Sequence, residues 1–130
     1  MSKNTDHATL LQVAEQAMER AYAPYSGFHV GAALKARGGK VYGGCNIENS
    51  SFGATVCAER VAVFKAISEG EANFEAIALV SRDDPRVLPC GMCRQVLWEL
   101  AGDIDVVIGG ASSIEVLKLS SLYPDPFKKS

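Results

Sequence analysis

The spacing of apolar and polar residues along the chain predicts three helices and five strands. Apolar residues recur every three or four positions in the helical segments, a period that gives a helix one buried face. These segments are residues 5–22, 57–69 and 90–101. The strand segments are shorter and richer in apolar or branched residues, and they are residues 28–36, 40–47, 74–81, 104–108 and 114–117. Residues 120–130 contain two prolines and are expected to form an irregular tail.

Glycine and proline residues set the expected boundaries of these elements. Pro24 is expected to end the first helix, while Gly70 and Gly102 stand where the second and third helices stop. The Arg-Gly-Gly sequence at residues 37–39 joins the first two strands as a hairpin. The pair Gly43–Gly44 interrupts the second strand and predicts a bulge or a close backbone contact there.

The order of the elements predicts the fold class. After the first hairpin, strands alternate with helices, which is typical of parallel strands joined by helical crossovers. Residues 74–81 are apolar almost throughout, so we expect them to form the buried central strand. The expected fold is α/β, a three-layer α-β-α arrangement with a central mixed five-stranded sheet. No repeat or linker divides the 130 residues, and residues 1–130 are expected to form one domain.

Composition and charge narrow the classes of function. The net charge of −2 and the sequence pI of about 5.7 leave no basic stripe for nucleic acid, which is therefore not an expected partner. No apolar run reaches the roughly 18 residues that cross a membrane, and the polar first seven residues lack the apolar part of a signal peptide. We therefore expect a cytoplasmic protein, whose four cysteines serve a metal or chemistry rather than disulfides.

Three of the cysteines form a pattern that predicts a catalytic zinc site. Cys90 and Cys93 are separated by two residues and can bind one ion from a single turn, and Cys57 can supply a third thiolate. Three protein ligands leave one corner of the zinc tetrahedron for water. Glu59 lies two residues after Cys57 and can reach that corner without being a ligand. A Cys-x-Glu followed by Pro-Cys-x-x-Cys is the signature of zinc-dependent nucleobase deaminases.

Two other interpretations of the cysteines remain open at this point. Cys45 could complete a closed structural zinc site, although its place within the second strand favours a small buried apolar residue. A redox Cys-x-x-Cys is the other alternative, and it leaves Cys57 and Glu59 without a purpose. The two histidines, His7 and His29, lie far from the motifs and are not assigned to the metal.

Three thiolates around zinc leave the site with a net charge of −1, which would keep a bound water protonated. Both cysteine motifs stand at expected helix N-termini, whose partial positive charge stabilises thiolates. We predict that Arg60 also donates hydrogen bonds to the sulfur atoms, the alternative being a surface arginine paired with a helix carboxylate. Arg94 fits either a packing or subunit contact or a role near the metal.

Asn46 and Glu48 alternate along the second strand, so both side chains are expected to point the same way. An amide and a carboxylate together suit sugar hydroxyls, and a carboxylate would repel a 5'-phosphate. The pair therefore favours a free nucleoside over a nucleotide. The alternative is a solvated strand face without a ligand.

Four motifs together resemble the small homotetrameric zinc-dependent cytidine deaminases. They are Ala-Pro-Tyr-Ser-Gly-Phe at residues 23–28, Asn-Ile-Glu-Asn at 46–49, Cys-Ala-Glu-Arg at 57–60 and Pro-Cys-Gly-Met-Cys-Arg-Gln at 89–95. The resemblance implies one zinc ion per subunit and a homotetramer whose pockets are shared between subunits. It also implies that Asn46 and Glu48 hold the ribose, that Phe28 packs on the pyrimidine, that Ala58 lies in the substrate pocket, and that Phe127 acts as a C-terminal aromatic reaching a neighbouring pocket.

The expected activity is hydrolytic deamination of cytidine and deoxycytidine to uridine and deoxyuridine in pyrimidine salvage. Zinc lowers the pKa of its water from about 15.7 toward 7 and so provides a hydroxide for attack at C4. Glu59 is expected to take the water's proton, protonate the ring nitrogen and then protonate the leaving amine. The alternatives are a deaminase of a related aminopyrimidine nucleoside such as blasticidin S, and a non-catalytic zinc-stabilised binding module.

Overall fold

The computed structural model describes residues 3–110 and 113–126. In chain order, its elements are α1 (Lys3–Met18), β1 (Val30–Ala36), β2 (Val41–Cys45), a 3-10 turn η1 (Phe52–Ala54), α2 (Ala58–Ser68), β3 (Phe74–Ser81), α3 (Gly91–Ala101), β4 (Asp105–Gly110), β5 (Ser113–Lys118) and α4 (Leu119–Leu122). None of the helices within these ranges has the length and apolar character needed to cross a bilayer.

The strands form one five-stranded sheet in the order β2-β1-β3-β4-β5. Strand β1 is antiparallel to both of its neighbours, so β2 and β3 point the same way, and β4 is parallel to β3. Helices α2 and α3 are the crossovers that join these three parallel strands. Because β5 returns antiparallel to β4, the sheet is mixed, as the sequence predicts.

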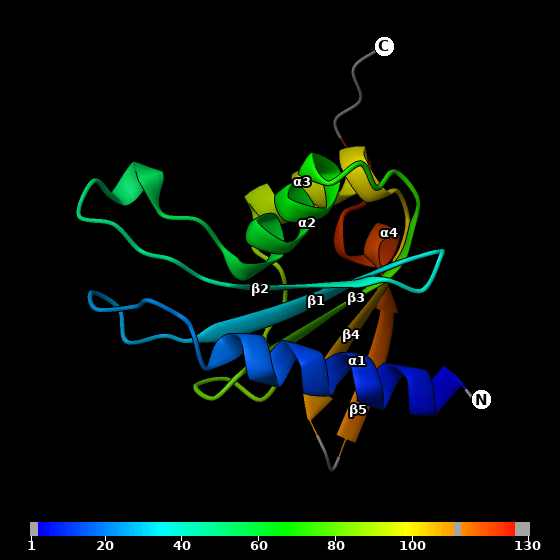
Figure 1. Cartoon of the computed structure of the whole chain (residues 1–130), viewed down its shortest axis with the longest axis horizontal. Helices are drawn as coiled ribbons and strands as arrows, with labels where there is room; N and C mark the ends of the chain where they lie inside the picture. The colour runs from blue at the N-terminus through cyan, green and yellow to red at the C-terminus, as the bar shows by residue number, and fades with distance from the viewer. Residues whose placement is uncertain (1–2, 111–112, 127–130) are drawn as a thin grey trace.

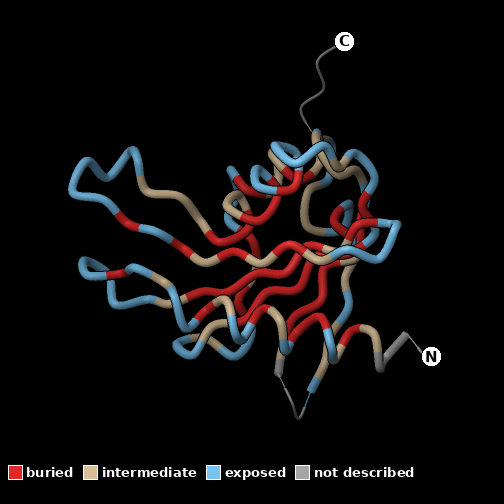
Figure 2. The backbone as a smooth tube through the Cα atoms, in the orientation of Figure 1, coloured by how far each residue is buried: buried red, intermediate tan, exposed pale blue. Residues whose placement is uncertain are grey.

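The helices cover the sheet in three layers. Helix α1 lies on one face, and α2, α3 and the short α4 lie on the other (Figure 1). Alternate residues of β1 serve the two cores, because Leu34 packs toward α2 and α3 while Ala33 packs toward α1. The central strands are buried on both faces (Figure 2). The expected place of residues 74–81 at the centre of the sheet is therefore confirmed.

Two glycines let the helices approach the sheet at van der Waals distance. A Cβ on Gly31 would lie 1.9 Å from the Ala14 carbonyl oxygen of α1. A Cβ on Gly44 would lie 2.6 Å from the Ala58 carbonyl oxygen and 2.7 Å from the Ala62 nitrogen, both in the first half of α2. The expected close backbone contact in the second strand is therefore found at Gly44, and it sets the position of the N-terminus of α2.

Three expected elements differ in the structure. Helix α1 ends at Met18 rather than at residue 22, because the backbone of Tyr22 pairs with residues 46 and 48 instead of continuing the helix. Strand β2 stops at Cys45, so that cysteine stands at a strand end and is partly exposed rather than buried in mid-strand. Residues 120–130 are expected to form an irregular tail, but residues 120–122 belong to the short helix α4, which begins at the fully buried Leu119.

The contact at Gly44 gives a test of how α2 is positioned. A methyl group in Gly44→Ala would collide with the backbone of α2, so we expect it to lower the free energy of unfolding by roughly 1–3 kcal/mol. Gly38→Ala is the matched control, because a Cβ at Gly38 meets nothing within 4 Å. Chemical denaturation of the two variants measures the difference, and equal stabilities would contradict the proposed packing.

Candidate metal centre and adjoining pocket

Two helix N-termini place the three motif cysteines. Cys57 is the N-cap residue of α2, and Cys90 is the N-cap residue of α3. Cys93 lies in the first turn of α3 and is fully buried, and its backbone N–H donates to Cys90 Sγ at 3.4 Å. Both helices follow parallel strands, so they begin at the carboxyl ends of those strands. Binding sites of α/β proteins usually lie at this end of the sheet.

The three sulfur atoms form a cluster of the size that zinc requires. They all lie within 4.8 Å of one another. With zinc–sulfur bonds of 2.3 Å, the edge of a tetrahedron is about 3.8 Å. Cys57 Sγ and Cys90 Sγ are 3.7 Å apart, and the Cys90–Cys93 separation of 3.0 Å would widen by less than about 1 Å. Cys45 is not in the cluster, which leaves a fourth corner free of cysteine within the described residues.

The surroundings of the cluster favour negative charge on sulfur. A hydrogen bond from the Cys93 thiol, supported by one from the Arg60 guanidinium, lowers the pKa of Cys57 to about 5 against the opposing effect of burial. The same sulfur–sulfur contact raises the pKa of Cys93, because two adjacent sulfurs do not both ionise without a cation. A metal ion would remove this conflict by taking both as thiolates.

Arg60 lies directly against this cluster. Its Nη2 donates to Cys57 Sγ at 3.5 Å and to the Thr55 carbonyl oxygen at 3.5 Å. Its Nε is buried and has no hydrogen-bond partner among the described residues. The guanidinium therefore contributes positive charge beside the sulfur atoms, where a three-thiolate centre needs it.

Glu59 is buried beside the cysteines, with 4% of its surface exposed. Burial raises the pKa of the carboxyl, and the negative charge of Cys57 acts in the same direction. The backbone N–H groups of Glu59 and Cys90 and the thiol of Cys93 donate toward the carboxyl and oppose that rise in pKa. A carboxyl with a raised pKa is a stronger proton acceptor than a solvated one, which suits a group that takes up and returns protons.

A pocket of about 250 Å³ opens onto this carboxyl. The predicted site residues that line it are Phe28, Asn46, Glu48, Cys57, Ala58, Glu59 and Cys90. Cys93 and Arg60 lie behind the wall, in contact with Cys57 or Cys90. Phe127 falls outside the described residues. The fold thus brings together segments before β1, after β2 and at the starts of α2 and α3.

Asn46 fastens one wall of the pocket. Its Nδ2 donates to the Phe28 carbonyl oxygen at 2.7 Å, and its Oδ1 accepts from the Val30 N–H at 2.9 Å. Both ends of the amide therefore hold the backbone that carries Phe28. Each end keeps one further hydrogen-bonding position, so Asn46 can also face a ligand.

Glu48 is held as a carboxylate at the mouth of the pocket. Its Oε1 accepts from the backbone N–H groups of Tyr25 and Ser26, at 2.9 and 3.1 Å, and its Oε2 accepts from the Ser26 hydroxyl. The hydroxyl bond is the largest cause that lowers the pKa of Glu48. Asn46 and Glu48 face the same pocket as expected, although both lie just beyond the end of β2.

Several lining residues had no role in the sequence interpretation. They are Ser26, Val30, Thr55, Val56, Val87 and Leu88. Ser26 lies within a recognised motif, but its bond to Glu48 joins residues 22 positions apart and has no local sequence signal. Beside them, Tyr25 and Phe52 meet edge to face with ring centroids 5.8 Å apart, over a second hollow that also borders Glu48.

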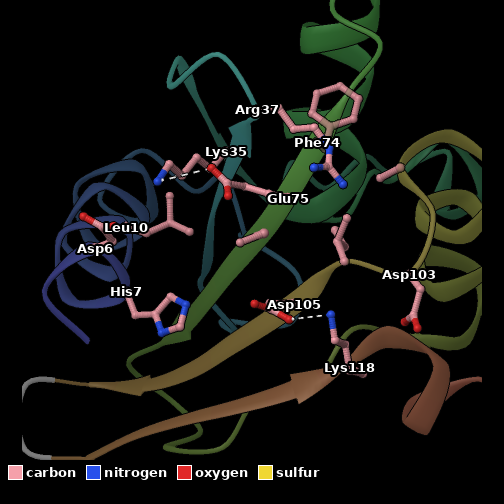
Figure 3. A pocket seen from close by; sticks show the side chains of 13 residues that line it. Asp6, His7, Leu10, Lys35, Arg37, Phe74, Glu75, Asp103, Asp105 and Lys118 are labelled. Atoms are coloured by element: carbon pink, nitrogen blue, oxygen red, sulfur yellow. Dashed lines mark ion pairs between the residues drawn. The ribbon is translucent and has the colours of Figure 1, made fainter. Parts of the chain in front are cut away.

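A cavity of about 260 Å³ lies at the opposite end of the parallel strands, where β3 and β4 begin (Figure 3). It is bordered by the start of β3 and of β4, and two ion pairs flank it, Lys35 with Glu75 at 3.3 Å and Lys118 with Asp105 at 3.1 Å. It contains none of the cysteines, and four of its charged side chains are engaged in these two ion pairs. The pocket beside Glu59 is therefore the better candidate for chemistry.

Comparison with known proteins agrees with the geometry of this site. A profile of the cytidine and deoxycytidylate deaminase zinc-binding region matches residues 4–110. Cytidine deaminase of Halalkalibacterium halodurans is 48% identical over 124 residues, covering 94% of each chain. Cytidine deaminase of Sporosarcina psychrophila is 45% identical over 126 residues, covering 95% of this chain and 93% of the relative.

A solved structure gives the same result for the fold. The crystal structure of cytidine deaminase from Burkholderia pseudomallei superposes with a TM-score of 0.88 at 43% identity, and covers 98% of this chain and 100% of the other. A blasticidin-S deaminase of Bacillus cereus is also similar, but at 32% identity over 124 residues. The chain is thus more similar to these cytidine deaminases than to that antibiotic deaminase.

The sulfur cluster predicts how zinc content responds to mutation. We expect one zinc ion per purified chain, and we expect Cys93→Ser to lose it because two sulfur ligands remain. Cys45→Ser is the matched control and should keep one zinc, since Cys45 lies outside the cluster. Elemental analysis after gel filtration measures both. Zinc loss in Cys45→Ser, or full zinc in Cys93→Ser, would contradict the assignment.

Proposed function

Because the chain belongs to the cytidine and deoxycytidylate deaminase family, we propose that it hydrolyses cytidine and deoxycytidine to uridine and deoxyuridine, releasing ammonia. The observation that carries this proposal is the buried Glu59 carboxyl between a three-sulfur cluster and a nucleoside-sized pocket. The expectation of a zinc-dependent enzyme, formed from the sequence, is confirmed at the level of the family.

Cys57, Cys90 and Cys93 would hold the zinc ion of this family, one per chain. When bound, the ion acts as a Lewis acid that makes water a nucleophile at neutral pH. Two helix N-termini and the Arg60 guanidinium place positive charge beside these sulfur atoms. Arg60 thus helps to offset the charge of three thiolates.

Glu59 moves the protons of the reaction. Conversion of cytidine to uridine breaks the bond from C4 to the amine and forms a carbonyl at C4 with the oxygen of water. Of the two water protons, one ends on N3 of the ring and the other on the departing ammonia. Glu59 accepts and delivers both protons and returns to its starting state, and its raised pKa strengthens it as the acceptor of the first proton.

Different residues of the pocket would bind the base and the sugar. Phe28 offers an aromatic face to the pyrimidine, and Ala58 stands at the first position of α2, where a backbone N–H has no partner within the helix. Asn46 and Glu48 would bind ribose hydroxyls with their remaining hydrogen-bonding positions. Phe127 would belong to a neighbouring pocket, as the resemblance implies.

The charge of Glu48 favours a nucleoside over a nucleotide. Its three hydrogen bonds lower the pKa of the carboxyl, so it is ionised at neutral pH. A phosphate charge about 4 Å from a carboxylate near the surface costs about 4 kcal/mol. The family name covers deaminases of cytidine and of deoxycytidylate. The Glu48 carboxylate favours cytidine as the substrate, because cytidine carries no phosphate.

The protein is further proposed to be a cytoplasmic homotetramer of one-domain chains, with pockets shared between subunits. Large exposed apolar side chains on α2 and α3 support this assembly. They are Phe64, Ile67 and Met92. Phe52 is 74% exposed at the second hollow, which also borders Glu48, and a neighbouring subunit would cover it there. A reducing compartment would keep the zinc-binding thiols free.

The activity is tested with the Glu59→Gln variant. We expect the wild-type protein to convert cytidine and deoxycytidine, measured by the loss of ultraviolet absorbance, and Glu59→Gln to lose at least about 10²- to 10⁴-fold in kcat while keeping its zinc. Glu69→Gln is the matched control, because Glu69 lies at the exposed end of α2 and pairs with Lys40. A zinc-loaded wild type that turns over blasticidin S but neither nucleoside would move the proposal to the antibiotic deaminases.

The assembly is tested by native mass measurement. We expect a mass near four times 13.8 kDa, together with slower proteolysis around Phe52 than in a dissociated subunit. A fully active monomer would contradict the proposal that subunits share their pockets.

A further inference from the structure

The guanidinium of Arg94 links the start of the second cysteine motif to the C-terminal segment of the chain. It lies in the second turn of α3, and its guanidinium is partly buried. Its Nε donates to the Pro89 carbonyl oxygen at 2.7 Å, and its Nη1 donates to the Leu122 carbonyl oxygen at 2.7 Å. It does not line the pocket beside Glu59.

The Pro89 carbonyl belongs to the peptide group that begins the second cysteine motif. A peptide group is a rigid plane, so fixing its oxygen also fixes its nitrogen. That nitrogen belongs to Cys90, whose N–H donates toward the Glu59 carboxyl and whose sulfur is part of the cluster. The hydrogen bond from Arg94 to Pro89 therefore helps to fix the position of Cys90 relative to both the sulfur cluster and Glu59.

The second carbonyl belongs to the C-terminal segment. Leu122 ends α4, which is anchored by the fully buried Leu119. The next residue, Tyr123, forms a hydrogen bond from its hydroxyl to Gln95 Oε1, and Gln95 is the neighbour of Arg94 in α3. Two adjacent residues of α3 thus hold two adjacent residues of the C-terminal segment.

We propose that Arg94 is a positioning residue that holds the Pro89–Cys90 peptide group in place and ties it to the C-terminal segment at Leu122. This inference rests on the proposed function for its effect on turnover, but its effect on the metal does not depend on the substrate. A planar guanidinium can donate to two carbonyls at once from fixed directions. A lysine ammonium can donate to one of them but lacks the second, rigidly placed N–H group.

A purely structural role for Arg94 predicts something different. Losing two hydrogen bonds from a charged group would lower the unfolding temperature. It would leave metal release and turnover unchanged well below the unfolding temperature. A positioning role predicts changes in both within the folded protein.

The experiment compares Arg94→Gln, Arg94→Lys and Tyr123→Phe with the wild-type holoenzyme, below the unfolding temperature of each. Zinc transfer to a chromogenic chelator gives the rate of metal release, and initial rates with cytidine give kcat and KM. Arg37→Gln is the matched control, because Arg37 is exposed at the opposite edge of the sheet (Figure 3).

We expect Arg94→Gln to release zinc about 10-fold faster and to lose roughly 10- to 100-fold in kcat, with KM changed less than about threefold. Arg94→Lys should recover part of both losses, Tyr123→Phe should show a smaller change in the same direction, and Arg37→Gln should match the wild type. If Arg94→Gln does not fold, Arg94→Lys and Tyr123→Phe carry the same comparison.

Wild-type rates of zinc release in folded Arg94→Gln and Arg94→Lys would overturn the inference, as would a loss confined to thermal stability. A rise in KM alone would also overturn it, because it would place Arg94 in substrate binding. If the wild type turns over no nucleoside, the proposed function fails, and the release of zinc from the variants still decides the role of Arg94.

Discussion

The site depends on the convergence of two helix N-termini at one edge of the sheet. Strands β2, β3 and β4 are parallel, so the helices that connect them both start at the same edge. Cys57 and Cys90 cap these helices, and their sulfur atoms lie 3.7 Å apart although 33 residues separate them. The approach of α2 to the sheet requires a residue without a side chain, which Gly44 supplies.

Charge is the second constraint, because three sulfur atoms that zinc would bind as thiolates lie beside a buried carboxyl. The helix N-termini and Arg60 supply positive potential beside the sulfurs, and burial raises the pKa of Glu59. The hydrogen bonds around Glu48 act in the opposite direction and keep that carboxyl ionised. Two carboxyl groups of one pocket are thus prepared for different tasks by their surroundings.

Part of the pocket wall comes from two segments that extend from one end of the sheet, the chain between α1 and β1 and the chain between β2 and α2 (Figure 1). They hold each other through Asn46, whose amide binds the backbone on both sides of His29, and through Glu48, which binds Tyr25 and Ser26. The residues proposed to bind the sugar are therefore also those that give the pocket its shape.

The sequence by itself determined the chemistry and the class of fold. The spacing of Cys90 and Cys93 predicted two ligands in one helical turn, which needs only local geometry, and the Cys57–Glu59 motif indicated a third ligand and a carboxyl beside it. The tertiary structure alone decided where α1 ends, since pairing of Tyr22 with distant backbone overrides the helical period. It alone also decided the partners of Arg94 and Ser26, because bonds across 22 to 28 residues depend on how the segments pack and leave no periodic signal in the chain.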